Sequence, residues 1–515
     1  MRAPDNVAAL LAEAVRGQGG RPAVVDQGRM LTYADLGNQV ERACAAVVGA
    51  GVSPGDRIAV WAPNSIEWIV AMLGLVCAGG VLVPINTRYK AGEAAEVLNR
   101  SRARLLFTVE DFLGRDYRSE LGGEELPFLE RTVAFCDWDS FLDEGKGLVD
   151  RARERASSLG AEDQLDLMFT SGTTGRPKGV PSRHGPAVRA YRHYAATLGI
   201  RPGDRYLLVN PLFHSFGAKA GVLAALCAGA TLYPVPVFDA SGAAELIRRE
   251  AITVFPGPPT VYHALLALPD ADRRGLRSLR LAVTGAATVP VELVRQMREV
   301  LGFDTVVTAY GLTEAGGLVT MCEPADDLGR IASTSGKAIP GLEVAVVGAD
   351  GEPVGAGEPG EVVVRGYAVM DGYFEDPEAT AETIDSEGWL HTGDIGVLDE
   401  ENYLRITDRK KDLFIVGGFN VSPAEVEQML MRHDSVAQAA VVGVPDERLG
   451  EVAHAFVVRR SGAAVDPEEL IAWSRARLAN FKVPRQVTVV AELPVNASGK
   501  VQRFVLRQRV LEDAP

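Results

Sequence analysis

Cysteine and net positive charge are both scarce in this sequence of 515 residues. The five cysteines lie far apart and form no C-x-x-C pair, a pattern that fits a reducing compartment and neither a disulfide framework nor a zinc site. Acidic residues outnumber basic ones by 68 to 53, which gives a formal net charge of -15. Because phosphate backbones are bound by clustered Lys and Arg, this charge argues against a nucleic-acid or anionic-membrane partner.

Apolar runs long enough to span a membrane are also missing. The longest run, from Ile69 to Ile85, has about 17 residues and falls short of a span. Gly79-Gly80 and Pro84 divide it, so it predicts a helix followed by a strand. The first residues, MRAPDNVAALLAEAVRGQ, place acidic residues in their apolar stripe and lack a signal-peptide core. We therefore expect a cytoplasmic protein with no membrane span.

The pattern that is present predicts a globular α/β protein of at least two domains. Apolar residues make up 47% and charged residues 23% of the chain, as in ordinary soluble proteins. From about residue 20 to 400, short Val/Ile/Leu-rich runs alternate with helical patterns, which predicts sheets covered by helices. From about residue 340 the pattern changes, and Asp350-Gly351 predicts a hairpin turn in a small antiparallel β subdomain.

A second, smaller domain is predicted after the charged segment DRKKD at 408–412. Ser422, Pro423 and Glu425 fit the N-cap, N1 and N3 positions of a capping box, so a new helix is expected to begin there. Two apolar strands, a second helix and another strand follow, which suffices for an α+β domain. The predicted domains are an N-terminal domain over residues 1–408 and a mobile C-terminal domain over residues 409–515.

The stretch MFTSGTTGRPKGV at 168–180 combines Ser, Thr and Gly with a single lysine, Lys178. Backbone N–H groups and hydroxyls with little bulk suit phosphate oxygens, and the lysine supplies positive charge. The Walker pattern GxxxxGK[ST] does not fit, because Gly172, Gly175 and Lys178 are misspaced and Gly179 follows the lysine. Taken alone, the stretch is compatible with a phosphate-binding loop or with a mobile surface loop.

Four more motifs follow in order: YGLTE at 310–314, WLHTGD at 389–394, DRKKD at 408–412 and PVNASGK at 494–500. Together with the stretch at 168–180, and with PINTRY and NPLFHSFG, they resemble the adenylate-forming superfamily over essentially the whole chain. That superfamily contains acyl-CoA synthetases, luciferase-like enzymes and nonribosomal adenylation domains. The resemblance implies an ATP-dependent acyl-CoA ligase that uses Mg2+ and coenzyme A. A carboxylic acid would first form an acyl-adenylate and pyrophosphate, and CoA would then displace AMP.

The resemblance also implies a nucleotide site. In it Tyr310 stacks on adenine, Asp394 and Arg409 bind ribose, and Glu314 is associated with magnesium, which suits the preference of Mg2+ for one or two carboxylates plus substrate phosphates. A core tyrosine and a solvated aspartate are the alternatives for Tyr310 and Asp394. The residues implied to bind ATP or AMP are Thr170, Ser171, Gly172, Thr173, Thr174, Gly175, Lys178, Gly285, Ala286, Ala287, Tyr310, Gly311, Thr313, Asp394 and Arg409.

The catalytic group implied by the resemblance is Lys500, which would stabilise charge where the carboxylate meets the α-phosphate. Glu314 and His214 complete the implied catalytic set, with His214 at the mouth of the acid pocket. Rotation about a hinge at Lys411 would replace the Lys500 face by a second face for the CoA step. The implied CoA-binding residues are Gly417, Gly418 and Phe419, and the implied acyl-pocket residues are His214, Gly217, Ala218, Gly221 and Gly316.

Two stretches, PLFHSFGAKAG and VTAYGLTEAGGLVTMCEP, are most similar to actinobacterial ligases that activate bulky alicyclic propanoates, such as steroid-derived or terpenoid acids. Small residues around the implied pocket agree with a wide acid site. The sequence ends soon after Lys500 without a carrier domain, so CoA is the expected acceptor. A stand-alone adenylation enzyme that loads a separate carrier protein is the alternative. Both a monomer and a homodimer are compatible with the sequence.

The sequence departs from the family just after the phosphate loop. Members usually have a small or apolar residue followed by Thr-His, whereas this chain has Pro181, Ser182, Arg183 and His184. Proline removes a backbone donor from the expected strand, and an arginine beside the triphosphate suggests a hypothesis: a half-enzyme that forms thioesters from a preformed acyl-adenylate. A nucleotide-binding protein without activity is a further alternative, although the four charged residues of the implied site argue against it.

Overall fold

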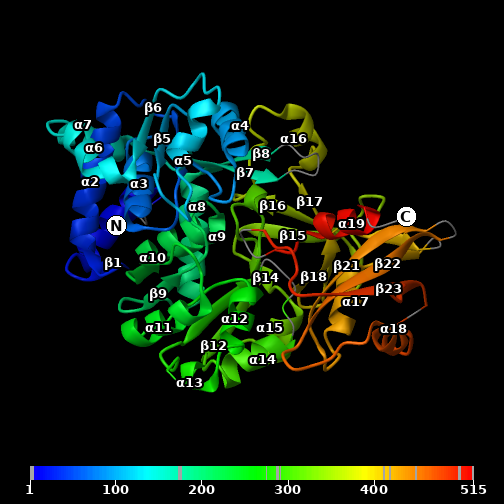
Figure 1. Ribbon diagram of the computed structural model, residues 1–515. Coiled ribbons are helices and arrows are strands. Elements are labelled where there is room, and N and C mark those ends of the chain that lie inside the picture. The colour runs from blue at the N-terminus through cyan, green and yellow to red at the C-terminus, as the bar shows by residue number, and fades with distance from the viewer. Residues whose placement is uncertain are drawn as a thin grey trace.

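The structure is a computed structural model that describes residues 5–171, 177–273, 275–285, 289, 291–409, 412–416, 419–446, 449–478, 480–496 and 500–512. Its strands form five sheets, and helices cover the sheets of the first half of the chain (Figure 1). Among the described residues, none of the helices combines the length and the apolar character needed to cross a membrane.

A six-stranded sheet carries the hairpin of the phosphate-loop motif. Its order is β6-β5-β3-β4-β7-β8, and every neighbouring pair is parallel except β7 with β8. The apolar run from residue 69 to 85 forms a buried helix and the next strand, α3 and β4, as predicted. The bounds are β3 (Arg57–Trp61), β4 (Val81–Pro84), β5 (Leu105–Thr108), β6 (Arg131–Ala134), β7 (Gln164–Ser171) and β8 (Pro177–Arg183).

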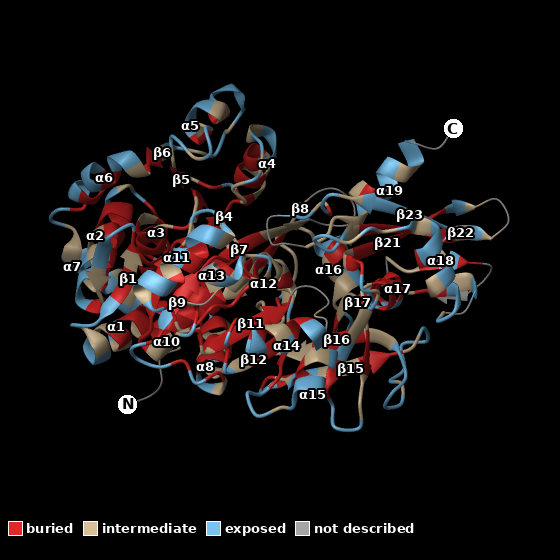
Figure 2. Cartoon of the chain, turned by 60° about the horizontal axis from the view of Figure 1, so that its bottom comes forward, coloured by how far each residue is buried: buried red, intermediate tan, exposed pale blue. Residues whose placement is uncertain are grey.

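Two four-stranded sheets lie beside it and share its main hydrophobic core, which Figure 2 shows as a nearly continuous buried interior. Their orders are β2-β1-β10-β9 and β11-β12-β13-β14. Parallel pairing of β11 with β12 places Gly285 and Tyr310 at the same, carboxyl edge. The bounds are β1 (Pro22–Asp26), β2 (Arg29–Thr32), β9 (Arg205–Leu208), β10 (Thr231–Pro234), β11 (Leu281–Gly285), β12 (Thr305–Tyr310), β13 (Thr320–Met321) and β14 (Lys337–Ala338).

The helices around these sheets bury apolar faces against the shared core. Thr32 begins α2 with a complete capping box, in which its side chain and that of Asp35 exchange bonds with the backbone. The bounds are α1 (Val7–Gln18), α2 (Tyr33–Gly49), α3 (Ile66–Cys77), α4 (Ala91–Ser101), α5 (Tyr117–Glu120), α6 (Trp138–Glu144), α7 (Val149–Ser158), α8 (His184–Thr197), α9 (Ser215–Gly217), α10 (Ala224–Ala228), α11 (Ala240–Glu250), α12 (Pro259–Leu266), α13 (Asp270–Arg273), α14 (Val291–Glu299), α15 (Leu328–Ser333) and α16 (Pro377–Thr383).

An antiparallel sheet of order β15-β16-β17-β18 confirms the predicted β subdomain. Between β15 and β16 the backbone turns at Gly351, whose φ of 84° is readily adopted only by glycine. The N–H of Gly348 donates to the carbonyl of Glu352 at 2.8 Å, which closes the predicted Asp350-Gly351 turn. The bounds are β15 (Leu342–Val347), β16 (Gly360–Gly366), β17 (Leu390–Leu398) and β18 (Leu404–Arg409).

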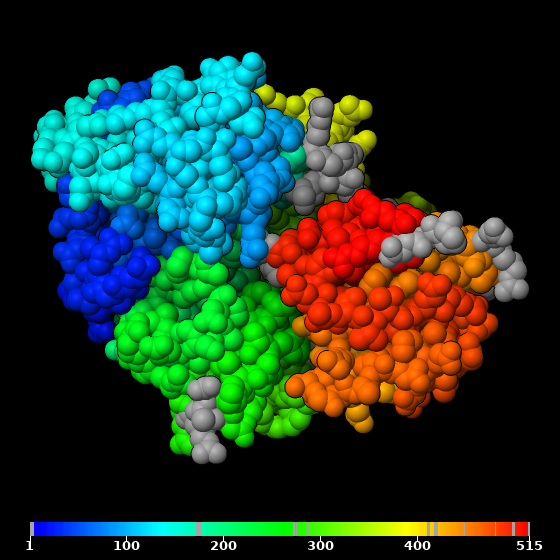
Figure 3. Space-filling view, in the orientation of Figure 1, coloured from blue at the N-terminus to red at the C-terminus, as the bar shows by residue number. Residues whose placement is uncertain are grey.

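The remaining elements form a C-terminal lobe, β19 to β23 with α17 to α19, which is orange to red on one side of the molecule (Figure 3). Ser422 caps α17 by accepting from the N–H of Glu425 at 3.2 Å. The other half of the predicted capping box is wrong, because the Glu425 carboxylate binds Lys482 instead. The bounds are β19 (Phe414–Val416), β20 (Phe419–Val421), β21 (Val436–Asp446), β22 (Gly450–Arg459), β23 (Gln486–Val490), α17 (Pro423–Leu430), α18 (Pro467–Arg475) and α19 (Arg503–Glu512).

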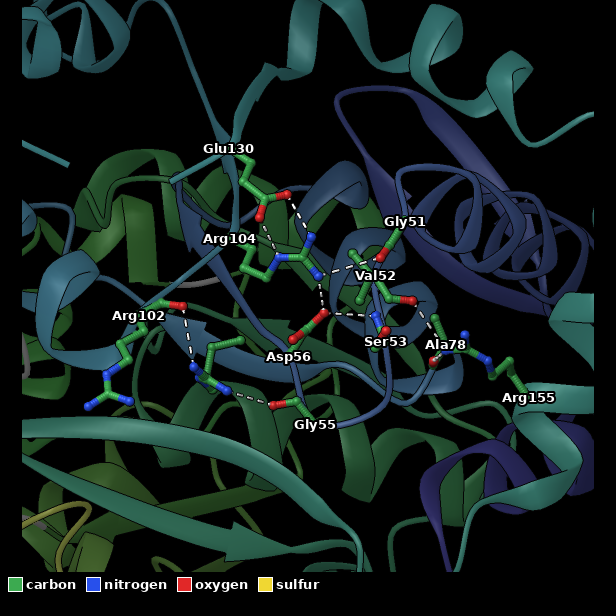
Figure 4. Close-up of polar contacts among 11 residues, drawn as sticks. Gly51, Val52, Ser53, Gly55, Asp56, Ala78, Arg102, Arg104, Glu130 and Arg155 are labelled. Atoms are coloured by element: carbon green, nitrogen blue, oxygen red, sulfur yellow. Dashed lines mark hydrogen bonds and ion pairs between the residues drawn. The ribbon is translucent and has the colours of Figure 1, made fainter. Parts of the chain in front are cut away.

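Arginine side chains form ion pairs and hydrogen bonds along the amino edge of the six-stranded sheet (Figure 4). Arg104, just before β5, lies between the carboxylates of Asp56 and Glu130. Arg155 donates to the carbonyl of Ala78 at 3.1 Å, at the end of α3. These contacts satisfy backbone and carboxylate acceptors at one edge of the sheet. The opposite, carboxyl edge remains for loops, which is where ligands bind in open α/β sheets.

Candidate active site

The phosphate-loop motif closes the hairpin of β7 and β8 at the carboxyl edge of the six-stranded sheet. In this antiparallel pair Thr170 lies opposite Lys178, and Ser171 lies opposite Pro177. Residues 172–176, which join the two strands, lie outside the described residues. The hairpin therefore fixes the two ends of the loop and holds Thr170 and Lys178 at neighbouring positions on its flank.

Glu314 lies beside this hairpin. It belongs to a 3-10 turn over Thr313–Ala315, directly after β12. Its carboxylate accepts from the hydroxyl of Tyr373 at 3.1 Å and from the hydroxyl of Thr170 at 3.5 Å. The ammonium of Lys178 lies 4.8 Å from the centre of the Tyr373 ring, within cation–π range. Residues from three distant parts of the chain thus gather around one carboxylate.

Sequence reasoning missed Tyr373, which lies outside every motif used above. Burial, and then the neighbouring Glu314 carboxylate, raises the pKa of the Tyr373 hydroxyl, which therefore stays protonated and can donate. Its ring faces Lys178 while its hydroxyl faces Glu314. Tyr373 therefore holds an acidic and a basic predicted site residue in fixed relation to each other. No local pattern around Tyr373 signals that position in the fold.

Tyr310 and Asp394 come from different sheets and meet. The hydroxyl of Tyr310, the last residue of β12, donates to Oδ2 of Asp394 at 2.7 Å. Asp394 lies in β17 and is only 4% exposed, so the alternative of a solvated aspartate is wrong. Its own N–H donates to the hydroxyl of Thr392 at 3.1 Å, which helps to fix the strand locally.

Two predicted site residues, Gly285 and Gly311, must be glycine because neighbouring backbone lies too close for a side chain. A Cβ at Gly285 would lie 2.4 Å from the carbonyl oxygen of Ala309, on the adjacent strand β12. A Cβ at Gly311 would lie 2.3 Å from the carbonyl oxygen of Gly317. Contacts this short do not occur in proteins, so both positions exclude any side chain. The close backbone approach leaves the carboxyl edge beside Tyr310 free of side-chain bulk.

His214 is the residue predicted at the mouth of the acid pocket. It precedes α9, and its Nδ1 accepts from the N–H of Phe216 at 3.2 Å. Burial lowers the pKa of His214 to about 4, with further lowering by the positive charges of Lys500 and Lys219. At neutral pH the imidazole is therefore uncharged and carries its proton on Nε2. The effect of Lys500 on this pKa also places the C-terminal lysine near His214.

The segment that carries Lys500 is closed by its own backbone. The N–H of Lys500 donates to the side-chain oxygen of Asn496 at 2.9 Å, and the N–H of Asn496 donates to the carbonyl of Lys500 at 2.8 Å. Val495 and Val501 form an isolated antiparallel bridge just outside that turn. Residues 497–499 lie outside the described residues. The bonds on both flanks hold Lys500 at the end of a tight turn.

Arg503, a second residue that sequence reasoning missed, anchors this turn to the C-terminal lobe. Its guanidinium makes a bidentate pair with Glu427 of α17, the shortest contact being 2.8 Å, and contacts Asp412 at 3.2 Å. Glu427 is 6% exposed and also accepts from the N–H of Val441 at 2.8 Å. Such a charged network is costly to break in a buried setting. It connects the Lys500 turn to the start of the lobe.

The predicted acyl-pocket glycines have a packing explanation. A Cβ at Gly217 would lie 2.1 Å from the carbonyl oxygen of Pro211, and one at Gly221 would lie 2.5 Å from the Leu208 side chain. Ala218 is fully buried. Gly316, at φ 71°, accepts from the hydroxyl of Tyr191 at 3.2 Å. Close packing accounts for the small size of the first two residues, and the pocket assignment stays a prediction.

The expectation that Arg183 lies beside the triphosphate is wrong. Arg183 ends β8 opposite Gln164, six residues beyond Pro177 and therefore about 20 Å along the strand from the phosphate loop. Its guanidinium binds Glu162 and, at 3.2 Å, Asp371. β8 lies at the edge of its sheet, where Pro181 is tolerated. The departure from the family pattern thus leaves the phosphate hairpin intact.

Some predicted residues lie outside the described residues, and for others only the backbone is described. Ser171, Arg409 and Phe419 belong to the second group, as the end of β7, the end of β18 and the start of β20. Those outside the described residues are Gly172, Thr173, Thr174, Gly175, Ala286, Ala287, Lys411, Gly417 and Gly418.

Comparison with known proteins agrees with this arrangement. The family model of the AMP-binding enzyme matches residues 11–374, and that of the AMP-binding enzyme C-terminal domain matches residues 425–500. A crystal structure of ATP-bound MatB from Rhodopseudomonas palustris superposes with a TM-score of 0.89 at 30% identity, covering 98% of each chain. The chain therefore belongs to the AMP-binding enzyme family and lies in its acyl-CoA ligase branch, as the sequence predicts.

Two relatives share a more specific name, 3-[(3aS,4S,7aS)-7a-methyl-1,5-dioxo-octahydro-1H-inden-4-yl]propanoyl:CoA ligase. The protein from Mycobacterium tuberculosis is 48% identical over 508 residues, which cover 98% of both chains. The protein from Rhodococcus jostii is 46% identical over 523 residues, covering 98% of this chain and 99% of its own. The named acid is bicyclic and carries two ring ketones, so the chain is similar to ligases of a bulky alicyclic acid.

Proposed function

We propose that the protein converts a bulky alicyclic propanoic acid into its CoA thioester with ATP. An oxygen of the acid attacks the α-phosphorus, and the bond to the β-phosphate oxygen breaks to release pyrophosphate. The CoA sulfur then attacks the acyl carbon, and AMP leaves. The observation that carries this proposal is the gathering of Thr170, Lys178 and Glu314 around Tyr373, together with the electrostatic effect of Lys500 on His214.

The nucleotide would lie along the carboxyl edges of β7 and β12. Tyr310 ends β12 where side-chain bulk is excluded, which suits a flat adenine ring. Asp394 is buried, and its carboxylate would bind the ribose hydroxyls; Arg409 lies opposite it in the ladder. Lys178 and the hairpin backbone would bind the β- and γ-phosphates and so stabilise the leaving pyrophosphate.

The residues present fit a magnesium ion. Mg2+ prefers oxygen ligands and usually binds through one or two carboxylates plus substrate phosphates. The Glu314 carboxylate and the Thr170 hydroxyl lie together beside the phosphate hairpin, so these two residues would hold the ion. When bound, Mg2+ would offset phosphate charge. Tyr373 would then keep Glu314 oriented by its hydrogen bond.

Lys500 would act in the first step. A carboxylate and a phosphate must approach each other there, and a positioned ammonium relieves their repulsion. His214 is neutral at pH 7, because its pKa lies near 4, so it adds no competing charge at the acid. Its Nε2–H is available to donate to the acid, because Nδ1 already accepts from the Phe216 N–H.

We also propose that the two predicted domains, 1–408 and 409–515, change their relative orientation between the steps. In this structure Lys500 lies near His214, which suits adenylation. Rotation near Lys411 would move the turn away and bring residues 417–419 to the site for CoA. Lys411→Pro fixes φ near -65°, so thioester formation should slow while pyrophosphate release persists. Normal acyl-CoA output by that variant would place the pivot elsewhere.

Coenzyme A is the proposed acceptor, and a carrier protein is the alternative. The high coverage of two CoA ligases favours CoA. A direct test supplies the purified protein with ATP, Mg2+ and a panel of acids, and measures pyrophosphate, acyl-AMP and acyl-CoA separately. The panel should contain the bicyclic dioxo-propanoic acid, acetate and palmitate. The bicyclic acid should give a higher kcat/KM than acetate, because each buried CH2 contributes about 0.8 kcal/mol, and a higher one than palmitate, because a wide pocket would hold a linear chain loosely. Preference for acetate or palmitate would contradict the proposed acid class.

A further inference from the structure

A buried lysine takes no part in the steps above. Lys219 is 1% exposed and belongs to a π-helix over Ala218–Leu223, directly after α9. Such π-helices are rare and often occur at functional sites. The π-helix packs on β9, where the hydroxyl of Tyr206 donates to the carbonyl of Ala220 at 2.8 Å. The segment that begins at His214 therefore also carries, five residues later, a buried ammonium.

The ammonium of Lys219 binds both strands of the phosphate hairpin. Its Nζ lies 3.0 Å from Oδ2 and 3.3 Å from Oδ1 of Asp166 on β7, and it donates to Oγ of Ser182 on β8 at 2.9 Å. Asp166 is also 1% exposed. An ammonium has three N–H donors, so these three oxygens account for all of them. Lys219 thus joins a segment that packs on β9 to the hairpin of a different sheet.

The two partners of Lys219 lie on the same face of the hairpin as two predicted phosphate-site residues. Asp166 and Ser182 are direct partners in the ladder of β7 and β8. Four residues farther along each strand, Thr170 pairs with Lys178, and the register between the two pairs is continuous. Side chains alternate along a strand, so both pairs point to one face. Lys219 therefore contacts the face that carries the phosphate-site pair, about 14 Å from that pair along the strands.

A buried ion pair of this kind fixes an arrangement more than it stabilises the fold. Moving two charges out of water costs about as much as their attraction contributes, whereas leaving one of them unpaired is strongly destabilising. The pair therefore tolerates only an arrangement in which the segment from His214, here called the acid side, stays on the hairpin. Thr170 and Lys178 form the phosphate side. The proposed first step needs such precision, because a misplacement of about 1 Å can slow a reaction about a hundredfold.

We propose that Lys219 is a positioning residue for acyl-adenylate formation, because its contacts with Asp166 and Ser182 fix the acid side of the site relative to the phosphate side. The effect of the Lys219 charge on the pKa of His214 agrees with this placement. The inference rests on the proposed function, which assigns the acid and the triphosphate to these two sides. Once the acyl-adenylate has formed, acid and phosphate are joined covalently. The contacts of Lys219 therefore matter for the first step and not for the thioester step.

The first test replaces the ion pair as a unit. Lys219→Met alone leaves the Asp166 charge buried and unpaired, so the variant carries Lys219→Met with Asp166→Leu, and circular dichroism and thermal unfolding check its fold. With the bicyclic dioxo-propanoic acid, kcat for pyrophosphate release should fall about 10- to 100-fold. The KM values for ATP and the acid should change by no more than about twofold, and so should thioester formation from premade acyl-adenylate.

The matched control removes another buried charge pair at the opposite edge of the sheets. Asp204, which is 3% exposed and directly precedes β9, pairs with Arg280, which directly precedes β11. Arg280→Met with Asp204→Asn should lower the melting temperature and leave both half-reactions near their wild-type rates. The positioning role would be overturned if the Lys219 variant lost both half-reactions equally or kept full pyrophosphate release. The same selective loss in the control would also overturn it.

Ser182 offers a test that leaves the ion pair in place. Ser182→Ala removes one of the three acceptors, so kcat for pyrophosphate release should fall about three- to tenfold, the value of one hydrogen bond. Ser182→Thr keeps a hydroxyl and should restore most of that rate. A wild-type kcat in Ser182→Ala, or no recovery in Ser182→Thr, would contradict the role of Lys219 even where the double variant fails to fold. A wild-type protein that releases no pyrophosphate with any acid of the panel would overturn the proposed function, and this inference with it.

Discussion

The two lysines proposed to meet the phosphates are held in very different ways. Lys178 lies in β8, where the ladder with β7 and the packing of a six-stranded sheet fix its backbone. Lys500 lies on a tight turn of the C-terminal lobe, closed by Asn496 and anchored by Arg503. The groups proposed to bind the nucleotide are therefore built into the sheet edge. The group proposed to assist the reaction is carried by the C-terminal lobe, an arrangement that would permit its removal before the CoA step.

The largest effect is expected from Lys500 itself. Lys500→Ala should reduce acyl-adenylate formation by at least about a hundredfold, the scale of losing one preorganised charge. With a premade acyl-adenylate, thioester formation should persist, because that step is proposed to use the other face of the lobe. Pyrophosphate release and single-turnover thioester formation measure the two steps. An equal loss of both would contradict the division of labour between the two regions.

The next largest effect is expected from Arg503, which anchors the Lys500 turn. Arg503→Met leaves Glu427 buried without its guanidinium partner, which costs about 3–5 kcal/mol, and misplaces Lys500. Adenylation should fall about 10- to 100-fold, in line with small displacements of a catalytic group. Arg507→Met on the same helix breaks an exposed pair with Glu451 and should have little effect. Similar losses in both variants would mean that the helix, and not the buried pair, positions Lys500.

A smaller effect is expected at the sheet edge that carries Lys178. Tyr373→Phe removes the hydroxyl that donates to Glu314 but keeps the ring against Lys178. The KM for Mg·ATP should rise about three- to tenfold, the value of one hydrogen bond, with little change in kcat. The control is Tyr403→Phe, which removes a hydroxyl bound to Asp326 at 2.6 Å away from the site. A Tyr373→Phe variant with the wild-type KM would exclude Tyr373 from the ATP site.

The smallest expected effect is a change in the pKa of His214, which tests whether the two regions approach each other. Lys500 lowers the pKa of His214, so Lys500→Met should raise that pKa above its value of about 4, although burial keeps it below the ordinary 6.5. An NMR titration, assigned with a His214→Gln variant, measures it. Because the folded pKa is the lower one, the unfolded state binds the proton first, and His214 costs stability as pH falls from 6.5 to 4. An unchanged pKa would mean that Lys500 does not approach His214 in solution.

Local sequence patterns determined much of the fold and predicted several residues of the candidate site. Gly79-Gly80 between two apolar runs separates α3 from β4 because glycine ends the helix and the short apolar run then joins a buried sheet. Motif order likewise predicted Thr170, Lys178, Glu314, Tyr310, Asp394 and Lys500 as site residues, and the structure brings Thr170 to Glu314 and Tyr310 to Asp394. Such features can be predicted from the sequence because they depend on residues close together in the chain.

Only the tertiary structure decided the partners that join distant segments. Arg183 follows the phosphate loop in sequence, yet the strand β8 carries it about 20 Å away to Glu162 and Asp371. Tyr373 and Lys219 have no motif of their own, and each binds a carboxylate on another strand or turn. The physical reason is that a buried charge or hydroxyl is tolerated only with a partner. Which residue becomes that partner depends on how the sheets and helices pack.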